Sequence, residues 1–493
     1  MLGLGSIAWF PRIPAGGFTM FMTSSVRRPA LSLAVTDRMA EGKALRKLTP
    51  RRSLATFQPA SERDPVAILE AENATRVAQL VGLRHERMAE SAFTFFRGGA
   101  AIMASDLATA PRSGIDVQLC GDAHLMNFGL FASRERRLVF DINDFDETDR
   151  GPFEWDLKRL AASFVVAGRA LGYTPYEQEL AVLDALGGYS TAMREFASWR
   201  NLDVWYSHFD VQAIFDHLRA TIPKSAKKRV PDLIARAQRK DAMRALRKLT
   251  EETPDGLRIK SDPPIVVRLD ESGHGILYTE EHLGQMVRDY VDSLPNDRHA
   301  LLAQYEMIDA ARKVVGVGSV GTRCFITLLT GRDDTDPLFL QVKQAEPSAL
   351  EPYVGSRRYE NHGERVVQGQ RLIQATPDIF LGWTRSMGTD GNVRDFYLRQ
   401  LHDQKASVIL ENLDLDLLRA YAKVCGWALA RAHARSGDRI LLAGYLGQSQ
   451  VFEQAMTAFA FTYADQNEAD HRALLDAMAS GRVAGTPSPA PLD

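Results

Sequence analysis

The character of the sequence changes at Val314, and this change restricts the chain to a mixed fold. Before it, apolar residues recur at helical spacing, with interruptions, up to about Ala311. After it, glycines and β-branched residues replace the helical pattern, and residues 314–329 and 338–342 are typical of antiparallel strands. The sequence therefore predicts an α+β fold in which a small strand-rich module at about 313–405 sits within a large, mainly helical chain.

The segments on both sides of this module set the expected domain organisation. A helical entry region precedes a strand that ends at Cys120, and two further short strands then form a hairpin. Those strands are expected at 128–131 and 137–142, and later helices at 155–170, 364–374, 415–433 and 450–478. The predicted divisions are a disordered tail at 1–45, a helical lobe at 46–312, a small lobe at 313–405, further helices of the large lobe at 406–479 and a disordered tail at 480–493.

Length and charge narrow the classes of protein to consider. With 493 residues, 45% of them hydrophobic, the chain is long enough for two or three domains and a large core. The 60 basic and 62 acidic side chains nearly cancel, which argues against a nucleic-acid coat or a membrane-surface protein. The three scattered cysteines form no disulfide framework. The sequence has no apolar run long enough for a transmembrane helix and no secretory signal. We therefore expect a cytoplasmic protein.

The strongest chemical signal is Asp122, which is followed five residues later by Asn127 and then by an acidic segment at 141–147. Phosphoryl transfer needs a carboxylate that accepts the proton of the attacking hydroxyl, and oxygen ligands that hold magnesium on the phosphates. Asp122, Asn127 and Asp144 supply that set, and the hairpin between them would bring the two segments together. Solvated turn carboxylates are the alternative, because Asp and Asn are common in turns.

Four short motifs follow one another here, namely Gly121-Asp122 to Asn127, Asp144-Phe145, Gly151-Pro152 and Trp155-Asp156-Leu157. In order and spacing they resemble the aminoglycoside phosphotransferase and choline kinase-like branch of the protein kinase-like superfamily. With Phe96-Arg97-Gly98 and residues 432–438, the chain from about Gly42 to Asp438 also resembles the bacterial family of unknown function called DUF2252. The resemblance implies a protein kinase-like two-lobe fold, with ATP and Mg²⁺ as cofactors.

The same resemblance assigns roles and exposes one departure. It implies that Asp122 is the catalytic base and that Asn127 and Asp144 bind the metal, Asp144 being favoured by its distance of twelve residues from Asp156. Asp141 and Asp146 remain alternative or additional ligands. Asp156 is interpreted as a residue at a helix start that braces the loop. The departure is Cys120, which stands where the related sequences commonly have histidine.

The second motif is the glycine-rich segment Gly316-Val317-Gly318-Ser319-Val320-Gly321, followed by a strand that carries Lys343. Glycines between two strands let backbone amides approach phosphate oxygens, and a lysine on the next strand can hold the α- and β-phosphates. A dinucleotide fold is disfavoured because no periodic helix opens at the third glycine. A plain glycine-rich hairpin is the alternative.

We expect Gly316, Gly318, Ser319, Gly321 and Lys343 to bind the nucleotide. Lys343 would need an acidic partner on the next helix, for which Glu364 is preferred and Glu351 is the rival. A strand at 396–401 would lie beside the adenine.

The order of the two motifs predicts a circular permutation. In kinase-like families the glycine loop and lysine precede the catalytic loop, whereas here Asp122 precedes Lys343. Residues 428–433 resemble the helix that normally leads into the catalytic loop. We therefore expect the helix at 418–433 to lie against the Asp122 loop, and the glycine-rich segment to face it across one cleft.

Several residues keep open roles. Arg97 could contact phosphate or form a structural ion pair, and His124 could touch substrate or orient its loop. His433 is interpreted as a structural or loop-bracing residue, because Ala443, five residues after Asp438, cannot bind metal. The basic run from Lys224 to Lys248 is interpreted as a solvated helix face or a dock for an acidic substrate.

These observations together predict an ATP- and magnesium-dependent phosphotransferase that acts on a hydroxyl of an unidentified small-molecule acceptor. One alternative is a nucleotide-binding pseudokinase or scaffold, and another is a nucleotidyltransferase on the same fold. The expected partners are a nucleotide and the acceptor, with no sign of nucleic acid or membrane.

Overall fold

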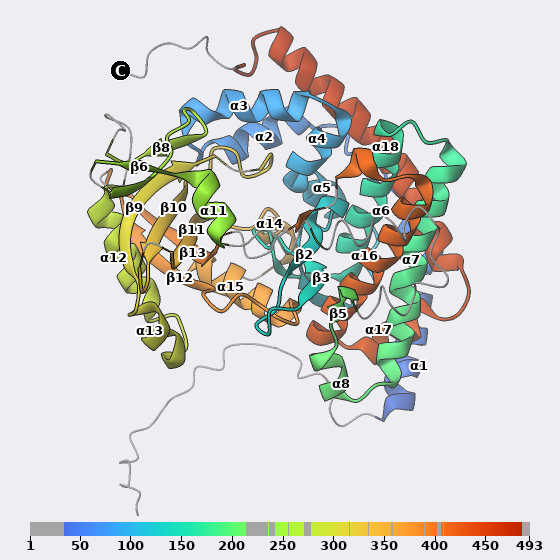
Figure 1. Cartoon of the computed structure of the whole chain (residues 1–493). Coiled ribbons are helices and arrows are strands. Elements are labelled where there is room, and N and C mark those ends of the chain that lie inside the picture. The colour runs from blue at the N-terminus through green and yellow to red at the C-terminus, as the bar shows by residue number, and fades with distance from the viewer. Residues whose placement is uncertain are drawn as a thin grey trace, which may run out of the picture.

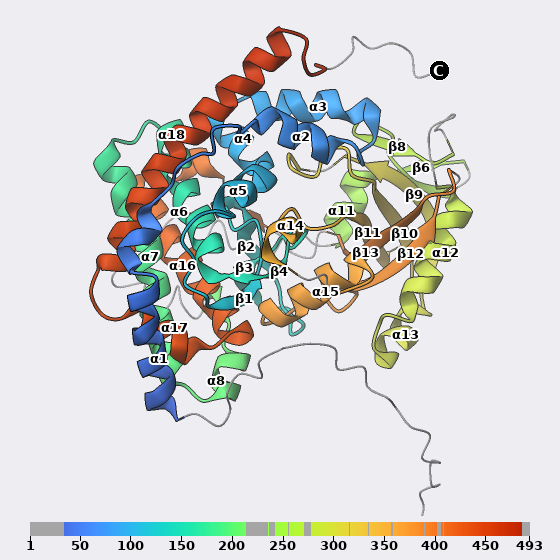
Figure 2. The same cartoon turned by 180° about the vertical axis from the view of Figure 1, so that it is seen from behind.

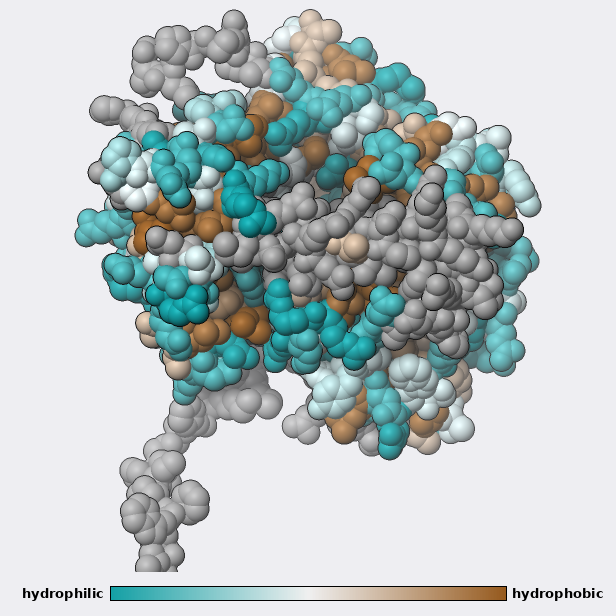
Figure 3. All heavy atoms as spheres, in the orientation of Figure 1, coloured by the Kyte–Doolittle hydropathy of each residue, from teal (hydrophilic) through white to brown (hydrophobic). Residues whose placement is uncertain are grey.

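The computed structural model describes residues 34–212, 235, 242–254, 256–270, 278–314, 316–333, 335–355, 358–388, 390–401, 406–407 and 409–485. Its α+β structure consists of a helix-rich part and a sheet-rich part that lie side by side (Figures 1 and 2). None of the helices in these ranges is long and apolar enough to cross a membrane. On the face seen in Figure 3, the coloured apolar residues form separate groups among hydrophilic ones.

The helix-rich part combines segments from both ends of the chain. Its central helix α6 (Phe153–Ala170) is buried from Phe153 to Gly168, as expected for a helix surrounded by others. Around it lie α7 (Pro175–Ser198), α16 (Leu415–Ser436) and α18 (Val451–Ala479), all joined in one hydrophobic core. The remaining helices of this part are α1 (Val35–Leu48), α2 (Pro65–Asn73), α3 (Ala78–Ala89), α4 (Ala92–Gly98), α5 (Ala100–Leu107), α8 (Asn201–Tyr206) and α17 (Arg439–Leu446).

Small sheets connect these helices to the loops of the candidate site. Strand β1 (Asp116–Leu119) pairs antiparallel with β4 (Asp149–Pro152). A second antiparallel sheet has the order β14-β2-β3-β5, with bounds Ala406–Ser407, Phe128–Ala132, Leu138–Ile142 and Phe209–Asp210. The predicted hairpin at 128–142 is therefore β2 and β3. Strand β14 brings the chain back to this sheet directly after the sheet-rich part.

The sheet-rich part is built on an antiparallel sheet with the order β12-β13-β11-β10-β9-β8. The bounds in that order are Gly382–Met387, Val393–Gln400, Pro337–Ala345, Cys324–Thr330, Glu306–Lys313 and Val266–Arg268. A separate hairpin consists of β6 (Thr250–Thr253) and β7 (Gly256–Ile259). The helices of this part are α11 (Ala242–Leu249), α12 (Glu280–Val291), α13 (Asn296–Leu302), α14 (Glu351–Val354) and α15 (His362–Ile373).

Both faces of this sheet are covered, which explains why apolar residues occupy positions on both faces of β10. Phe325 and Leu329 lie in one hydrophobic cluster with residues of α12 and α13, whereas Ile326 and Leu328 lie in another with residues of α11. Successive side chains of a strand point to opposite faces, so a sheet buried on both sides needs apolar residues at every position. The sheet thus forms a core of its own beside that of the helices.

The prediction of disordered tails is wrong where the structure describes them. Residues 35–45 belong to α1, which packs on α17. The contact is unusually close: a Cβ on Gly42 would lie 2.0 Å from the carbonyl oxygen of Leu441, and one on Gly444 would lie 2.4 Å from that of Met39. At the other end, Val483 is buried. Residues 1–33 and 486–493 lie outside the described residues.

The prediction of helices up to Ala311 is also wrong, because β6, β7, β8 and β9 lie in that interval. The sheet-rich part consequently begins well before residue 313, and the helices α12 and α13, predicted for the large lobe, cover its sheet. The basic run lies mostly outside the described residues, since 213–234 and 236–241 are not among them. The helices predicted at 364–374, 415–433 and 450–478 are confirmed as α15, α16 and α18.

Candidate active site

The loop between β1 and β2, residues 120–127, is held by the carboxylate of Asp156 at the start of α6. The backbone N–H groups of Cys120 and Gly121 donate to its two oxygens at 2.8 and 3.0 Å. Gly121 has a φ of +87°, and a Cβ there would lie 2.1 Å from the carbonyl oxygen of Glu147. Glycine is therefore required at this position.

A second brace comes from α16. Nε2 of His433 lies 3.2 Å from Asp156 Oδ2, and its Nδ1 lies 2.9 Å from the hydroxyl of Tyr189. The interpretation of Asp156 and His433 as loop-bracing residues is confirmed. Tyr421, also on α16, donates its hydroxyl to the Leu125 carbonyl at 2.5 Å, so α16 lies against the Asp122 loop as expected.

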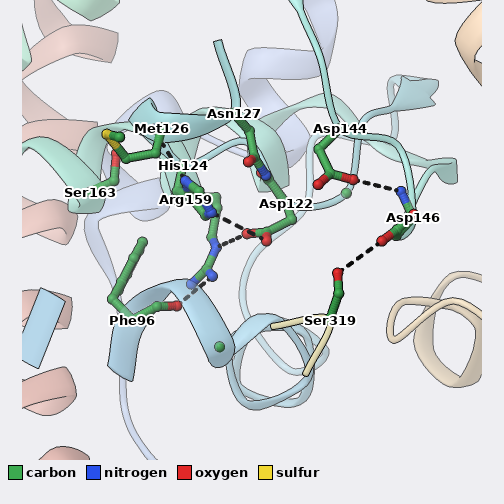
Figure 4. A network of polar contacts seen from close by, with 12 residues as sticks. Phe96, Asp122, His124, Met126, Asn127, Asp144, Asp146, Arg159, Ser163 and Ser319 are labelled. Atoms are coloured by element: carbon green, nitrogen blue, oxygen red, sulfur yellow. Dashed lines mark hydrogen bonds and ion pairs between the residues drawn. The ribbon is translucent and has the colours of Figure 1, made fainter. Parts of the chain in front are cut away.

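The Asp122 carboxylate is oriented by two side chains (Figure 4). Arg159 Nε donates to Asp122 Oδ1 at 2.8 Å, and His124 Nε2 lies 3.5 Å from Oδ2. Burial lowers the pKa of His124 to about 3, so its imidazole is neutral. Because His124 Nδ1 accepts the N–H of Met126, Nε2 carries the ring proton and faces Asp122. The open role of His124 is thus answered by an orienting contact.

Asn127 and Asp144 supply oxygen atoms next to Asp122. The side-chain amide of Asn127 donates to the Asp122 carbonyl at 2.8 Å, which leaves its oxygen for other partners. Asp144 Oδ1 accepts the N–H of Asp146 at 3.3 Å. The two segments are joined directly, since the Asn143 N–H donates to the Asn127 carbonyl at 2.9 Å. Asn127 and Asp144 therefore both line one cavity.

Asp146 is enclosed by residues of the sheet-rich part. It forms an ion pair with Lys343, and accepts hydrogen bonds from Tyr397 at 2.6 Å and Ser319 at 3.2 Å. Burial alone would raise the pKa of Asp146, but the charge and hydrogen bond of Lys343 outweigh burial and hold the pKa below its usual range. Among the described residues, the Asp144 carboxylate accepts only the N–H of Asp146, whereas the Asp146 carboxylate has three side-chain partners. Asp141 is excluded from the site by its buried ion pair with Arg431, whose Nη2 donates to both carboxylate oxygens at 2.6 Å.

The glycine-rich segment connects β9 to β10, as predicted. Its carbonyls are tied to the N-terminal helices, because Arg76 donates to Gly318 and Val320 at 2.8 and 2.6 Å. In the described part of the chain, the N–H groups of Gly318 and Ser319 donate to no acceptor. Successive backbone donors of this kind form sites for anions.

These loops line one cavity of about 250 Å³. The lining residues include Asp122, His124 and Asn127, then Asp144 and Asp146, and finally Gly316, Gly318 and Ser319. Two segments that are almost 200 residues apart in the sequence are therefore brought face to face, as expected. Arginines and glutamates of the N-terminal helices and of the segment after β11 complete the wall.

Three of the sequence-predicted residues do not line this cavity. Lys343 is buried behind Asp146, and the carbonyl of Gly321 accepts the N–H of Val77. Glu364 is not the partner of Lys343, because Asp146 takes that position. Glu351 lies on α14, with its carboxylate 3.9 Å from His362.

A family model described as "Uncharacterized protein conserved in bacteria (DUF2252)" matches residues 76–477. The chain belongs to this family. No curated protein and no solved structure matches the chain. The DUF2252 match spans the Asp122 loop, the acidic segment and the glycine-rich segment. Of the residues that line the cavity, Glu72 and Thr75 precede the matched part of the chain.

Arg97 lines this DUF2252 site and was named from the sequence, whereas Arg159 and Arg365 were not predicted. Arg159 orients Asp122, and Arg365 on α15 donates to the carbonyls of Asp146 and Glu346 at 2.8 and 2.9 Å. A signal existed for Arg159, since it lies three residues after Asp156 and so shares its helix face. Arg365 follows Glu364 directly. Helix α15, which follows the strand of Lys343, therefore reaches the site through Arg365 instead of Glu364.

Proposed function

We propose that this protein is an ATP- and magnesium-dependent phosphotransferase that acts on a hydroxyl group of a small molecule. The observation that carries the proposal is the convergence of Asp122, Asn127, Asp144 and the glycine-rich segment on one cavity. A proton acceptor, oxygen ligands for a metal and backbone donors for phosphates are the parts that phosphoryl transfer requires. The proposal includes a protein kinase-like two-lobe fold.

Asp122 is the proposed base. The acceptor hydroxyl gives its proton to Asp122 while its oxygen forms a bond to the γ-phosphorus. The bond from that phosphorus to the β–γ bridging oxygen breaks, and ADP leaves with the electron pair. Arg159 keeps the Asp122 carboxylate aimed at the cavity.

The side chains present are suited to magnesium. Mg²⁺ is usually bound through one or two protein carboxylates together with phosphates and water, rather than by an all-protein cage. Asn127 and Asp144 provide protein oxygens, and the described residues contain no cluster of three or more His, Cys, Asp or Glu side chains that would hold a metal alone. When bound there, magnesium would neutralise charge on the β- and γ-phosphates.

The phosphates would lie against the glycine-rich segment. The N–H groups of Gly318 and Ser319 would donate to them, and the charge of Lys343 stands behind Asp146 and Ser319. Lys343 thus fixes the acidic segment to the sheet, beside the place proposed for the phosphates.

A permuted kinase-like chain accounts for the order of these parts. Two contacts support it: α16 lies against the Asp122 loop through Tyr421 and His433, although it follows the loop by about 300 residues. In the kinase-like families named above, a helix of this position runs directly into the loop. The chain order is thus rearranged while the proposed arrangement in space is kept.

A nucleotide-binding protein without turnover is the second candidate. It is favoured by the enclosure of Lys343, which is 3% exposed and paired with Asp146. Such a protein would bind nucleotide and leave it unchanged.

The test is a thermal-shift series on the purified protein with ATP and ADP, with and without Mg²⁺. A ligand that binds the native state raises the melting temperature, so ATP with Mg²⁺ is expected to stabilise the protein. Absence of any nucleotide effect would refute the proposal. The mass of products formed from a library of hydroxyl compounds then separates the outcomes: a gain of one phosphoryl group indicates phosphotransfer, a gain of a nucleotidyl group indicates nucleotidyl transfer, and unchanged ATP indicates the second candidate.

A further inference from the structure

Arg97 differs from the other cationic side chains that line the cavity. Arg84 forms an ion pair with Glu72 at 2.9 Å, and Arg76 donates to two carbonyls of the glycine-rich segment. The Arg97 guanidinium makes no hydrogen bond or ion pair within the described residues, and its Nε is buried. Arg97 as a whole is half-buried. Because a buried guanidinium nitrogen without a partner is costly, its presence calls for a ligand.

The backbone around Arg97 is held firmly between the two halves of the site. The carbonyl of Phe96 accepts a hydrogen bond from Arg159 at 2.5 Å, and the same guanidinium holds Asp122 (Figure 4). On the other side, the carbonyl oxygen of Arg97 lies 3.4 Å from the point where a Cβ of Gly318 would be. Arg97 therefore stands where the glycine-rich segment approaches the Asp122 loop.

Charge in the cavity points to an anion at this place. Burial lowers the pKa of Arg97, while the charges of Asp122 and Asp144 act in the opposite direction without forming an ion pair. The guanidinium thus remains charged, and its donors remain available. A fork of N–H donors of this kind fits phosphate oxygens.

We propose that Arg97 binds the γ-phosphate of the nucleotide, between the glycine-rich segment and Asp122. This inference rests on the proposed function and names the group that holds the transferred phosphoryl. During transfer Arg97 would stay bound to the equatorial oxygens of that phosphoryl as it moves from ADP to the acceptor oxygen. The Asp122 carboxylate would take the hydroxyl proton, as described above.

The test compares a nonhydrolysable ATP analogue with ADP, each with Mg²⁺, in calorimetric titrations of the full chain. Arg97→Met removes the charge and keeps the length of the side chain, Arg97→Lys keeps the charge, and Arg200→Met serves as a control at an exposed arginine. We expect Arg97→Met to weaken the ATP analogue roughly tenfold to a hundredfold and to change ADP less than about twofold. Arg97→Lys should lie between Arg97→Met and the wild type.

The outcomes separate this inference from the function on which it rests. If the wild type binds neither nucleotide, the proposed function fails and Arg97 fails with it. If the wild type binds both and Arg97→Met weakens both equally, or neither, the γ-phosphate contact is refuted while the nucleotide site stands. In that case Arg97 would have a role in binding the acceptor or in the structure.

Stability without ligand provides the remaining check. Because Arg97 has no partner in the described residues, Arg97→Met should leave the melting temperature of the ligand-free protein unchanged or raise it. A clear fall in both Arg97→Met and Arg97→Lys would assign Arg97 a structural role and overturn the proposal.

Discussion

Lys343 on β11, which is buried, and Asp146 in the acidic segment, which is half-buried, form an ion pair across 197 residues of sequence. Ser319 and Tyr397 bind the same carboxylate, so three segments of the sheet-rich part meet one side chain of the helix-rich part. The pair therefore fixes the glycine-rich segment relative to Asp144 and the Asp122 loop. Its strength can be measured apart from any activity.

Lys343→Met should leave the half-buried Asp146 carboxylate without its cationic partner, although Tyr397 and Ser319 would still donate to it. We expect a loss of roughly 3–5 kcal/mol in the free energy of unfolding, the usual cost of breaking a buried ion pair. The double variant Lys343→Met, Asp146→Asn should recover most of that loss, because it leaves no isolated charge. Urea denaturation of the three proteins checks this, and equal losses in the single and double variants would contradict it.

Asp122→Asn should lower turnover by roughly 10²–10⁴-fold, the usual contribution of a general base. Affinity for ATP with Mg²⁺ should change little, because Asp122 is proposed to contact the acceptor. ADP release gives the rate and calorimetry gives the affinity. Asp203→Asn, at an ion pair on the surface, is the matched control. Unimpaired turnover in Asp122→Asn would remove this residue from the role of base.

Asp144→Ala should have the complementary effect on binding. Since it removes a proposed magnesium ligand, the affinity for ATP measured with Mg²⁺ should fall roughly tenfold or more, in line with the cost of perturbing metal sites. The affinity measured in EDTA should stay the same. Titration of both proteins under the two conditions provides the comparison, and an equal effect in EDTA would point to a role other than metal binding.

Glu147 should make stability depend on pH. Burial raises its pKa to about 7, from an ordinary value of 4.5. The folded protein thus keeps a proton that the unfolded chain has lost, so this contribution to stability is complete below about pH 4.5 and is lost as pH rises through 7. The loss is of the order of 3 kcal/mol.

Glu147→Gln isolates this effect, because a glutamine oxygen can still accept the N–H of Ala349. Between pH 4.5 and 8 the wild type should lose stability relative to Glu147→Gln. His124, whose pKa is lowered to about 3, stabilises in the opposite sense as pH rises but is present in both proteins. Parallel pH profiles from urea denaturation would show that Glu147 titrates normally.

Gly42→Ala should separate α1 from α17, because the added Cβ would lie 2.0 Å from the carbonyl oxygen of Leu441. We expect a loss of about 1–3 kcal/mol, as for other overpacked contacts, and faster tryptic cleavage at Lys43 and Lys47. Gly187→Ala is the control, since nothing lies within 4 Å of its Cβ position. That variant should gain up to about 1 kcal/mol. Equal behaviour of the two variants would mean that α1 is not docked.

Much of the local structure was readable because it depends on neighbours in the chain. Helical periodicity located α6, α15, α16 and α18, and the spacing of Asp122 and Asn127 identified the loop between β1 and β2. The meeting of that loop with the glycine-rich segment was also expected. The order of the two motifs led to that expectation, and residues of both motifs line one cavity.

What the sequence did not predict depends on packing between distant segments. Lys343 pairs with Asp146 instead of Glu364 because the sheet packs against the acidic segment. No periodic pattern in the sequence predicts that packing. Helix α1 was missed for a related reason. Gly42 is its buried residue, so its contact with α17 is made by the backbone and leaves no apolar stripe to detect.

The position of α16 has a consequence for how the protein is made. His433 braces Asp156 from 277 residues further along the chain, so the Asp122 loop leaves the ribosome without the helix that supports it. At roughly 5–20 residues per second, about 300 further residues take some tens of seconds to synthesise. Throughout that time the nascent chain carries the loop with an incomplete core around it. The site is therefore assembled only when translation has nearly ended, and a stall before α16 would release a chain that contains Asp122, Asn127, Asp144 and Lys343 but lacks the brace at Asp156.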